Sequence, residues 1–436
     1  NNKCILCRRC VAACKTMQGI GVIGANDRGF DTHIASAFEV KLGTTSCIGC
    51  GQCIVACPVG ALYERDDTDK VFEALADESK HVLICAAPSV RAQIGECFGY
   101  EPGTDVEGKM VAAMKLLGFD GVYDMNFTAD LTIMEEATEF LGRVKNGGVL
   151  PMITSCSPGW VNFCELYYPE MIDHLSSCKS PQQMGGALIK TYWADKMGID
   201  PKDIFVVSIM PCTAKKDEKE RDQMQRDGIK DVDAVLTTRE LARMIKRAGI
   251  LFTRLPDEEF DQDLMGDYTG AGVIFGATGG VMEAALRTAV EKLTGETLED
   301  VDFTAVRGME GVKEAEYDVA GKKIKVAIAS GTKNAKVLMD QIKNGTSEYL
   351  FIEIMGCPGG CINGGGQPIQ HAVVRNFVDL KARRAEALYT ADRNNAVRKS
   401  HENEAIKTLY TEFFGKPGSH KAHEVLHTSY VARKKY

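Results

Sequence analysis

Two runs of closely spaced cysteines constrain this chain more than any other feature. They are Cys4-x2-Cys7-x2-Cys10-x3-Cys14 and Cys47-x2-Cys50-x2-Cys53-x3-Cys57, the second followed by Pro58. Each iron of an Fe4S4 cube needs one thiolate, and in this doubled pattern the fourth cysteine of a run reaches the other cube. The spacing therefore predicts one cluster on Cys4, Cys7, Cys10 and Cys57, and a second on Cys47, Cys50, Cys53 and Cys14. The tandem runs disfavour structural zinc, and two cubes in one small module predict electron transfer.

The remaining composition is that of a globular protein. The 436 residues are 26% charged and 44% hydrophobic, which predicts about two to four domains. The 16 cysteines are clustered and too sparse for a secreted disulfide scaffold, which indicates metal sites in a reducing compartment. A net charge of −8 gives no basic footprint for nucleic acid. No signal peptide and no apolar run near the ~20 residues that span a bilayer is recognisable.

We therefore expect a cytoplasmic protein with no nucleic-acid and no membrane partner. The chain starts at Asn1, just before the first cysteine run. This start predicts a fragment or processed form of a longer protein.

A change of pattern near residue 67 predicts two parts. We expect residues 1–66 to form an α+β ferredoxin-like module with two clusters. In residues 67–436, apolar segments alternate with helical patterns, which is typical of an α/β domain with parallel sheets. The expected strands are 82–85, 149–153, 204–210, 324–328 and 349–355, and the expected helices are 134–144, 181–197, 238–248 and 281–293. Residues 377–427 are charged and helical in pattern, and we interpret them as a surface-packed tail.

Three further cysteine motifs follow expected strands, so their residues can converge at the strand ends. They are TSCSPGW at 154–160, MPCTAKKDE at 210–218 and EIMGCPGGCINGGGQP at 353–368. The glycines between Cys357 and Cys361 let the backbone approach a cluster closely. Lys215, three residues after Cys212, can place a cation beside an anionic ligand. Together the motifs predict a third Fe4S4 site with a positive group next to it.

These motifs resemble those of the catalytic subunit of FeFe-hydrogenase. The second and third match the family signatures MPCxxKxxE and ExMxCxGGCxxGGGxP, and the resemblance extends to His427. It implies a two-lobed hydrogenase domain that reversibly reduces protons to dihydrogen. It also implies an H-cluster, which is an Fe4S4 cube joined through a cysteine thiolate to a two-iron subsite. That subsite carries CO, cyanide and azadithiolate ligands and is built by maturation proteins.

The resemblance also implies roles for individual residues. Cys212, Cys357 and Cys361 would bind the cube, with Cys361 bridging to the two-iron subsite. Lys215 would bind one cyanide, and Pro88 with Ser89 the other. The other implied residues are Gln182, Met210 and Met355 in the pocket wall, and Cys156, Glu136, Ser176, Glu139 and Arg143 in a proton path. Helical spacing places Glu136, Glu139 and Arg143 on one face of a helix, although such a face alone is typically just solvated.

The first motif departs from the family pattern, which has two adjacent cysteines. By register, Cys156 holds the proton-relay position and Ser157 holds the position of the cube ligand. A serine alkoxide is a poorer iron ligand than a thiolate. Either Ser157 binds or leaves one iron weakly held, or a local shift lets Cys156 bind and Ser157 relay protons. The residues leave both alternatives open.

Three functions are compatible with these motifs. The first is a hydrogenase, which the lysine, the glycines and the acidic residues favour. The second is a hydrogenase-like iron–sulfur assembly or sensor protein, which only Ser157 favours. The third is a hydrogenase subunit in an electron-bifurcating complex, with ferredoxin or NAD(P)-reducing subunits as redox partners. Four cysteines without ligand spacing are expected to be buried free thiols, namely Cys85, Cys97, Cys164 and Cys178. The glycines of 276–280 are expected to serve tight packing.

Overall fold

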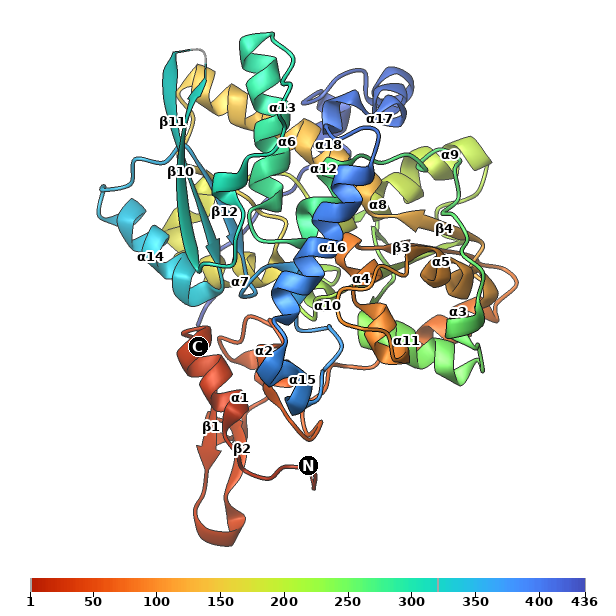
Figure 1. The fold of residues 1–436 in the computed structure, drawn as a ribbon, viewed down its shortest axis with the longest axis vertical. Helices are drawn as coiled ribbons and strands as arrows, with labels where there is room; N and C mark the ends of the chain where they lie inside the picture. Colours follow the sequence, from red (N-terminus) through yellow and green to blue (C-terminus); the bar gives the residue numbers. More distant parts are fainter. Residues whose placement is uncertain (1, 320, 436) are drawn as a thin grey trace.

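The first part of the chain is a small module that projects from the rest (Figure 1). The computed structural model describes residues 2–319 and 321–435. Strand β1 (Ile23–Asn26) pairs antiparallel with β2 (His33–Ser36). Two short helices, α1 (Arg9–Ala12) and α2 (Gln52–Ala56), pack against each other and carry Cys10 and Cys53. The module therefore has the α+β content that its cysteine runs predicted.

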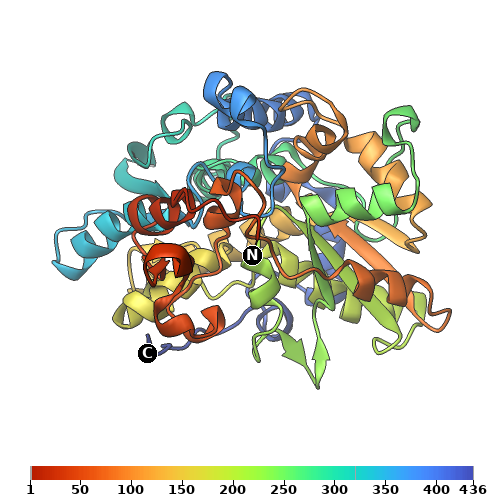
Figure 2. The ribbon, with the colours of Figure 1, turned by 90° about the horizontal axis from the view of Figure 1, so that it is seen from below.

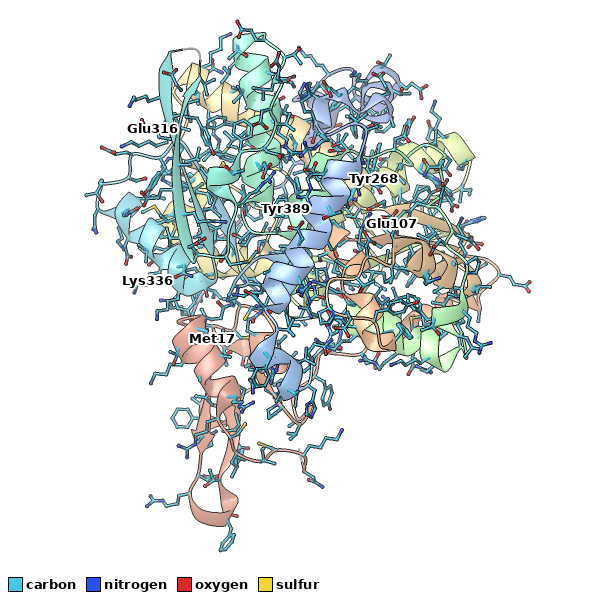
Figure 3. All side chains as sticks on the ribbon, viewed as in Figure 1. Met17, Glu107, Tyr268, Glu316, Lys336 and Tyr389 are labelled. Atoms are coloured by element: carbon cyan, nitrogen blue, oxygen red, sulfur yellow. The ribbon has the colours of Figure 1, made fainter. Side chains whose placement is uncertain are left out.

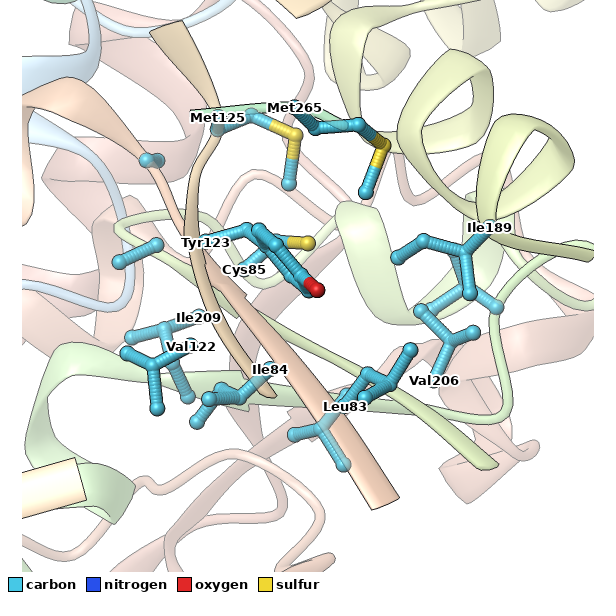
Figure 4. Close-up of a cluster of buried hydrophobic side chains, with 14 of the residues drawn as sticks. Leu83, Ile84, Cys85, Val122, Tyr123, Met125, Ile189, Val206, Ile209 and Met265 are labelled. Atoms are coloured by element: carbon cyan, nitrogen blue, oxygen red, sulfur yellow. The ribbon is translucent and has the colours of Figure 1, made fainter. Parts of the chain in front are cut away.

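The first large sheet is fully parallel and has the strand order β4-β3-β6-β9. Figure 4 shows part of its core, where Cys85 and Tyr123 of paired strands lie side by side near Met125 and Met265. Strands β3 and β6 were predicted. Strands β4 and β9 were missed, because each has only four residues, all buried, and so shows no alternation of polar and apolar residues. The strands are β3 (His81–Ala86), β4 (Gly121–Asp124), β6 (Ile204–Met210) and β9 (Ala234–Thr237). The neighbouring helices are α3 (Thr68–Leu75), α4 (Pro88–Arg91), α5 (Glu107–Leu116), α10 (Lys215–Glu218) and α11 (Thr238–Arg247).

The second sheet has the order β10-β11-β12-β5, in which only the β10–β11 pair is antiparallel. The apolar segment 149–153 pairs only through its last two residues, so the expected strand there is shorter than predicted. The strands are β5 (Met152–Ile153), β10 (Val312–Val319), β11 (Lys322–Ser330) and β12 (Phe351–Met355). The neighbouring helices are α6 (Asn126–Asn146), α7 (Pro158–Tyr167), α12 (Gly270–Val273), α13 (Gly280–Thr294) and α14 (Thr332–Lys343).

The four expected helices are present, and one of them is interrupted. Residues 181–197 form α8 (Pro181–Leu188), a π-helical turn (Ile189–Trp193) and α9 (Ala194–Met197). A small hairpin of β7 (Gln225–Arg226) and β8 (Ile229–Lys230) follows. Within the described residues, we find no helix whose length and apolar character would let it cross a bilayer.

The C-terminal segment is helical, but it is not confined to the surface as we expected. Its helices are α15 (Ala372–Phe377), α16 (Leu380–Asn394), α17 (Glu404–Leu409) and α18 (His420–Leu426). Helix α16 crosses the middle of the molecule, where Figure 3 labels Tyr389. Its Arg384 pairs with Glu96 at 2.7 Å, and its Asp392 pairs with Arg287 at 2.8 Å. These groups are buried, so the segment is part of the core.

The glycines of the third motif bring three segments into backbone contact. A Cβ at Gly364 would overlap the carbonyl oxygen of Pro211, and one at Gly365 would overlap that of Cys50. Thr213 Oγ1 also donates to Gly49 O at 2.6 Å, and Gln52 Nε2 donates to Asn363 O at 2.8 Å. On the other side, Thr332 Oγ1 of α14 donates to Gln18 O at 2.6 Å, and Figure 2 shows the N-terminal module beside α14. The module is therefore docked on the ends of both sheets.

We predict that Gly365→Ala loosens this docking. The added methyl group meets backbone atoms of Cys50 and Gly51, and overpacking of this kind typically costs about 1–3 kcal/mol. We expect a lower thermal midpoint and faster proteolysis within residues 1–66. Gly24→Ala is the control, because a Cβ there meets no atom within 4 Å. Equal midpoints and cleavage rates for the two variants would contradict the prediction.

Candidate metal centres and their surroundings

The second predicted ferredoxin-type cysteine set lines a single cavity. Cys14, Cys47, Cys50 and Cys53 all contribute to its wall. Burial, followed by the charges of the other thiols, raises the pKa of Cys53 to about 12. Four thiols that interact this strongly in one cavity are a suitable ligand set for an Fe4S4 cube.

The first predicted set lies nearer to the solvent. Cys4 and Cys7 are exposed, whereas Cys10 and Cys57 are buried. The charges of Cys57 and Cys7 both act on Cys10, although burial is the main reason that its pKa is raised. Burial also opposes ionisation of Cys57, but four nearby backbone N–H groups lower its pKa overall. These donors favour a thiolate, which is the form that binds iron.

The three later motifs converge on one buried cavity, which we call the central cavity. It has an accessible volume of about 80 Å³ and lies at the carboxyl ends of β3, β6 and β12. Its wall includes most of the predicted residues, namely Pro88, Cys156, Ser157, Gln182, Met210, Cys212, Lys215, Met355, Cys357 and Cys361. Ser89 follows Pro88 in α4 and is fully buried.

Lys215 is the buried cation of the central cavity. Its Nζ lies 3.0 Å from Glu218 Oε2 and donates to the Cys156 carbonyl at 3.1 Å. Glu218 Oε2 also accepts from Gln182 Nε2 at 3.0 Å and from Ser180 Oγ at 2.9 Å. Burial raises the pKa of Cys212 and Cys361, and the charge of Lys215 opposes that rise at both thiols. Lys215 therefore favours anionic groups in this cavity.

The cavity wall fits an anionic iron–sulfur group with polar ligands. Three thiols that suit iron, Cys212, Cys357 and Cys361, face it together. Among the described residues, Ser89 Oγ and Gln182 Oε1 are buried polar atoms without a hydrogen-bond partner. Buried polar groups normally have partners. Gln182 lines the cavity, so its oxygen is available to a polar group bound there.

The structure separates the environments of Cys156 and Ser157. Ser157 precedes α7, and its Oγ accepts the Gly356 N–H at 3.0 Å, directly before Cys357. Burial raises the pKa of Cys156 strongly, and the next largest cause is the charge of Glu136. Ser157 therefore lies beside Gly356 and Cys357, whereas Cys156 is near enough to Glu136 for their charges to interact.

The predicted proton-path residues Glu136, Ser176, Glu139 and Arg143 are linked by hydrogen bonds, and Glu136 is close enough to Cys156 for its charge to act there. Glu136 of α6 is only 1% exposed, and its Oε2 lacks a partner among the described residues. Burial, then the charge of Glu139, raises its pKa to about 8, while a hydrogen bond with Ser176 opposes the rise. Ser176 Oγ donates to Glu139 Oε2 at 3.0 Å, and Arg143 Nη2 donates to Glu139 Oε1 at 2.7 Å. The chain thus reaches the partly exposed Arg143.

Sequence reasoning missed several polar groups around the cysteines. Gln18 hydrogen-bonds the Cys50 thiol, and Gln52 hydrogen-bonds the Cys357 thiol, which in each case opposes the pKa rise caused by burial. Glu353 accepts the N–H groups of Gly279 and Met282 at 2.7 and 2.8 Å. Only Glu353 lies in a recognised motif, so the two glutamines gave no sequence signal.

The remaining expectations were mostly correct. Cys85, Cys164 and Cys178 are buried free thiols, but Cys97 is partly exposed. The glycines of 276–280 do serve tight packing, since a Cβ at Gly280 would overlap the Ile274 carbonyl.

Comparison with protein families and known proteins gives a consistent result. Sequence models match residues 80–365 as "Iron only hydrogenase large subunit, C-terminal domain", 378–433 as "Iron hydrogenase small subunit" and 3–61 as "4Fe-4S dicluster domain". The NADP-reducing hydrogenase subunit HndD of Solidesulfovibrio fructosivorans is 50% identical, over 100% of this chain and 74% of that protein. Iron hydrogenase 1 of Clostridium pasteurianum is also 50% identical, over 98% and 74%.

A more distant relative and a solved structure extend the comparison. Protein NAR1 of Arabidopsis thaliana is 31% identical, over 90% of this chain and 86% of that protein. The apo form of the FeFe-hydrogenase HydA1 from Chlamydomonas reinhardtii has a TM-score of 0.75 and 41% identity, and the match covers 84% of this chain and 99% of that chain. One family model covers most of the chain, and two relatives are 50% identical to it over nearly its whole length. The chain therefore belongs to the iron-only hydrogenases, the FeFe-hydrogenase family.

Proposed function

We propose that this chain reversibly reduces protons to dihydrogen at an H-cluster bound in the central cavity. One observation carries the proposal. Cys212, Cys357 and Cys361 meet there from two different sheets, beside the buried Lys215. We further propose two domains, 1–66 for electron entry and 67–436 for catalysis, the latter with one lobe on each large sheet.

The residues of this chain would hold the cofactor and keep its surroundings dry. When bound, the H-cluster supplies the iron centre at which protons and electrons combine, and its ligands are CO, cyanide and azadithiolate. Cys212, Cys357 and Cys361 would bind the cube, with Cys361 as the bridge and Ser157 at the fourth position. Lys215 on one side, and Pro88 with Ser89 on the other, would bind the cyanides. Gln182, Met210 and Met355 would complete the wall and exclude water.

Protons would move through groups of the chain itself, because a closed cavity excludes bulk water. Cys156 would exchange a proton with the cofactor, and Glu136 would resupply it. Glu136 holds its proton at neutral pH because its pKa is about 8. Ser176 and Glu139 would pass protons from the surface near Arg143. Relays of this kind typically contribute about 10²–10⁴-fold to a rate.

Electrons would enter through the N-terminal module, residues 1–66. The exposed Cys4 and Cys7 put the first cluster nearest to solvent. The second is adjacent to the central cavity, because the Cys50 carbonyl oxygen lies 4.0 Å from Cys357 Sγ. Ferredoxin or NAD(P)-reducing subunits are the proposed redox partners. The similarity to the NADP-reducing hydrogenase subunit HndD supports the NAD(P)-reducing subunits. The interaction of this chain with maturation proteins and its cytoplasmic location stay predictions.

A second candidate is a non-catalytic role like that of an iron–sulfur assembly protein. The specific observation in its favour is Ser157, which puts a weak iron ligand beside Cys357. The hydrogen-bonded chain from Glu136 to Arg143 favours catalysis instead, because an assembly protein has no need of a proton route.

Infrared spectroscopy with a dihydrogen assay tests the proposed function. Protein produced together with the FeFe-hydrogenase maturation proteins should show CO and cyanide bands and evolve dihydrogen from a reduced donor. Protein produced without them is the control, and it should keep its Fe4S4 clusters but give neither signal. Maturation that yields no CO or cyanide bands and no dihydrogen would contradict the proposal and favour the assembly role.

The assignment of Cys156 and Ser157 is tested by a pair of variants. Ser157→Cys should raise the iron content and the occupancy of the third cluster, because a thiolate binds iron better than an alkoxide. Cys156→Ala should keep the cluster spectrum and lose most of the turnover. If Cys156→Ala loses the cluster and Ser157→Cys leaves the iron content unchanged, then Cys156 is the ligand.

The proton route predicts opposite effects of Glu136→Gln on rate and stability. The variant should turn over about 100-fold or more slowly. The pKa of Glu136 is about 8 in the folded protein and 4.5 ordinarily. As the pH rises from 4.5 to 8, Glu136 therefore ionises in the unfolded chain but not in the folded one, and the free energy of unfolding falls. Glutamine does not ionise, so the variant lacks this loss of stability. The thermal midpoint of the variant minus that of the unaltered protein should therefore increase as the pH rises over that range.

Glu165→Gln is the matched control for this test. Glu165 is equally buried but pairs with Arg221 at 2.8 Å, away from the route. It should lower stability and leave the rate per cluster unchanged. A Glu136→Gln protein with an unaltered rate would exclude Glu136 from the route.

A further inference from the structure

Three potential metal ligands meet at the proposed proton route, and two of them, Cys178 and His427, have no role in the proposed function. The three are Glu139 of α6, Cys178 in the loop before α8, and His427 just after α18. Their donor atoms all lie within 4.8 Å of one another, and Cys178 Sγ is 3.8 Å from Glu139 Oε2. Cys178 is 1% exposed, and the side chains of His427 and Glu139 are 6% and 13% exposed.

This donor set has the chemistry of a zinc site. Thiolate, imidazole and carboxylate are the three ligand types that zinc binds in proteins, and three protein ligands with one open position form a common arrangement. With metal–ligand distances of about 2.0–2.3 Å, two tetrahedral ligand atoms lie about 3.3–3.6 Å apart. The observed 3.8 Å between the thiol and the carboxylate is close to that separation. Mg²⁺ and Ca²⁺ prefer oxygen ligands and would not select the thiol.

The surrounding hydrogen bonds orient the ligands in the way that zinc sites require. His427 Nε2 lies 3.0 Å from Glu135 Oε2, and Glu135 is itself held by Tyr410 OH at 2.5 Å and Gly418 N at 2.9 Å. A carboxylate that fixes one ring nitrogen leaves the other free to bind metal. That other nitrogen, Nδ1, contacts Ser177 Oγ at 2.8 Å, and a metal ion could replace this hydroxyl.

The local charges permit a cation at this position. Arg143 binds Oε1 of Glu139, whereas the thiol approaches Oε2, so the arginine and the proposed ion occupy different sides of the carboxylate. His427 also lines a surface cavity, so one of the three ligands is reachable from solvent. Two lysines of that cavity, Lys179 and Lys190, are paired with Asp231 and Asp233 at 2.8 and 2.7 Å, so their charges are largely balanced.

We propose that Glu139, Cys178 and His427 form a zinc-binding site, and that zinc bound there closes the proton route. Coordination would occupy Glu139 Oε2, which is the atom that accepts the Ser176 hydroxyl. The binding itself is independent of the enzymatic activity, whereas the effect on turnover rests on the proposed function.

Zinc binding is tested on the protein with its iron–sulfur clusters in place, so that cluster cysteines are not available. Equilibrium dialysis against zinc, followed by metal analysis, should find one more zinc per chain in the unaltered protein than in Cys178→Ala or His427→Gln. Zinc-edge X-ray absorption should show one sulfur neighbour at about 2.3 Å, lost in Cys178→Ala. Cys164→Ala removes a buried thiol elsewhere and should bind zinc normally. Equal zinc contents in all four proteins would overturn the site.

The effect on the route is measured separately. The dihydrogen evolution rate of each protein with zinc is divided by its own rate without zinc. We expect a fall of about 100-fold for the unaltered protein, because a blocked relay forfeits its whole contribution, and a ratio near one for Cys178→Ala. Zinc that binds by dialysis and absorption without changing the rate would overturn the closure of the route. Metal analysis measures the zinc content without any enzymatic turnover. A protein that evolves no dihydrogen would therefore give the same zinc-binding result.

Discussion

Backbone packing at Gly364, Gly365 and Gly366 holds the site together. Each lacks a side chain where another segment passes, namely Pro211 after β6, Cys50 of the N-terminal module, and Thr237 at the end of β9. A cluster-binding loop must approach other backbones within van der Waals distance, and only glycine permits this at three successive positions. The same contacts place Cys50 next to Cys357, so the proposed electron route and the central cavity depend on one packing constraint.

Burial gives the charged groups around the cavity their properties. Lys215 and Glu218 are paired where water is excluded, so that neither charge is left uncompensated. Glu136 has no ion pair among the described residues, and burial, followed by the charge of Glu139, raises its pKa to about 8 although the charge of Arg143 opposes the rise. The two carboxylates, three residues apart, thus differ in their surroundings, because Glu136 is buried whereas Glu139 is partly exposed and pairs with Arg143 at 2.7 Å.

The sequence predicted the site better than the fold around it. Cysteine spacing alone grouped Cys14 with the second run, and the cavity containing all four cysteines agrees with this grouping. The strands β4 and β9 were missed because they are short and buried on both faces, which removes the alternation that identifies a strand. Gln18 and Gln52 were missed because a single polar residue far from its partner in sequence carries no pattern. Ligand roles, by contrast, stay predictions, since geometry brings residues together without showing what they bind.

The C-terminal segment shows why a charged helical pattern was misinterpreted as a surface tail. Its polar residues face inward and pair with the rest of the chain: Arg384 with Glu96, Asp392 with Arg287, and His427 with Glu135. Composition cannot distinguish a solvated charge from one with a buried partner, because the partner lies far away in sequence. The family model that matches residues 378–433 is named "Iron hydrogenase small subunit", and here Asp392 and His427 fix that segment against α13 and α6. His427 thereby reaches Glu135, the residue before Glu136 in α6, so the segment packs beside the proposed proton route.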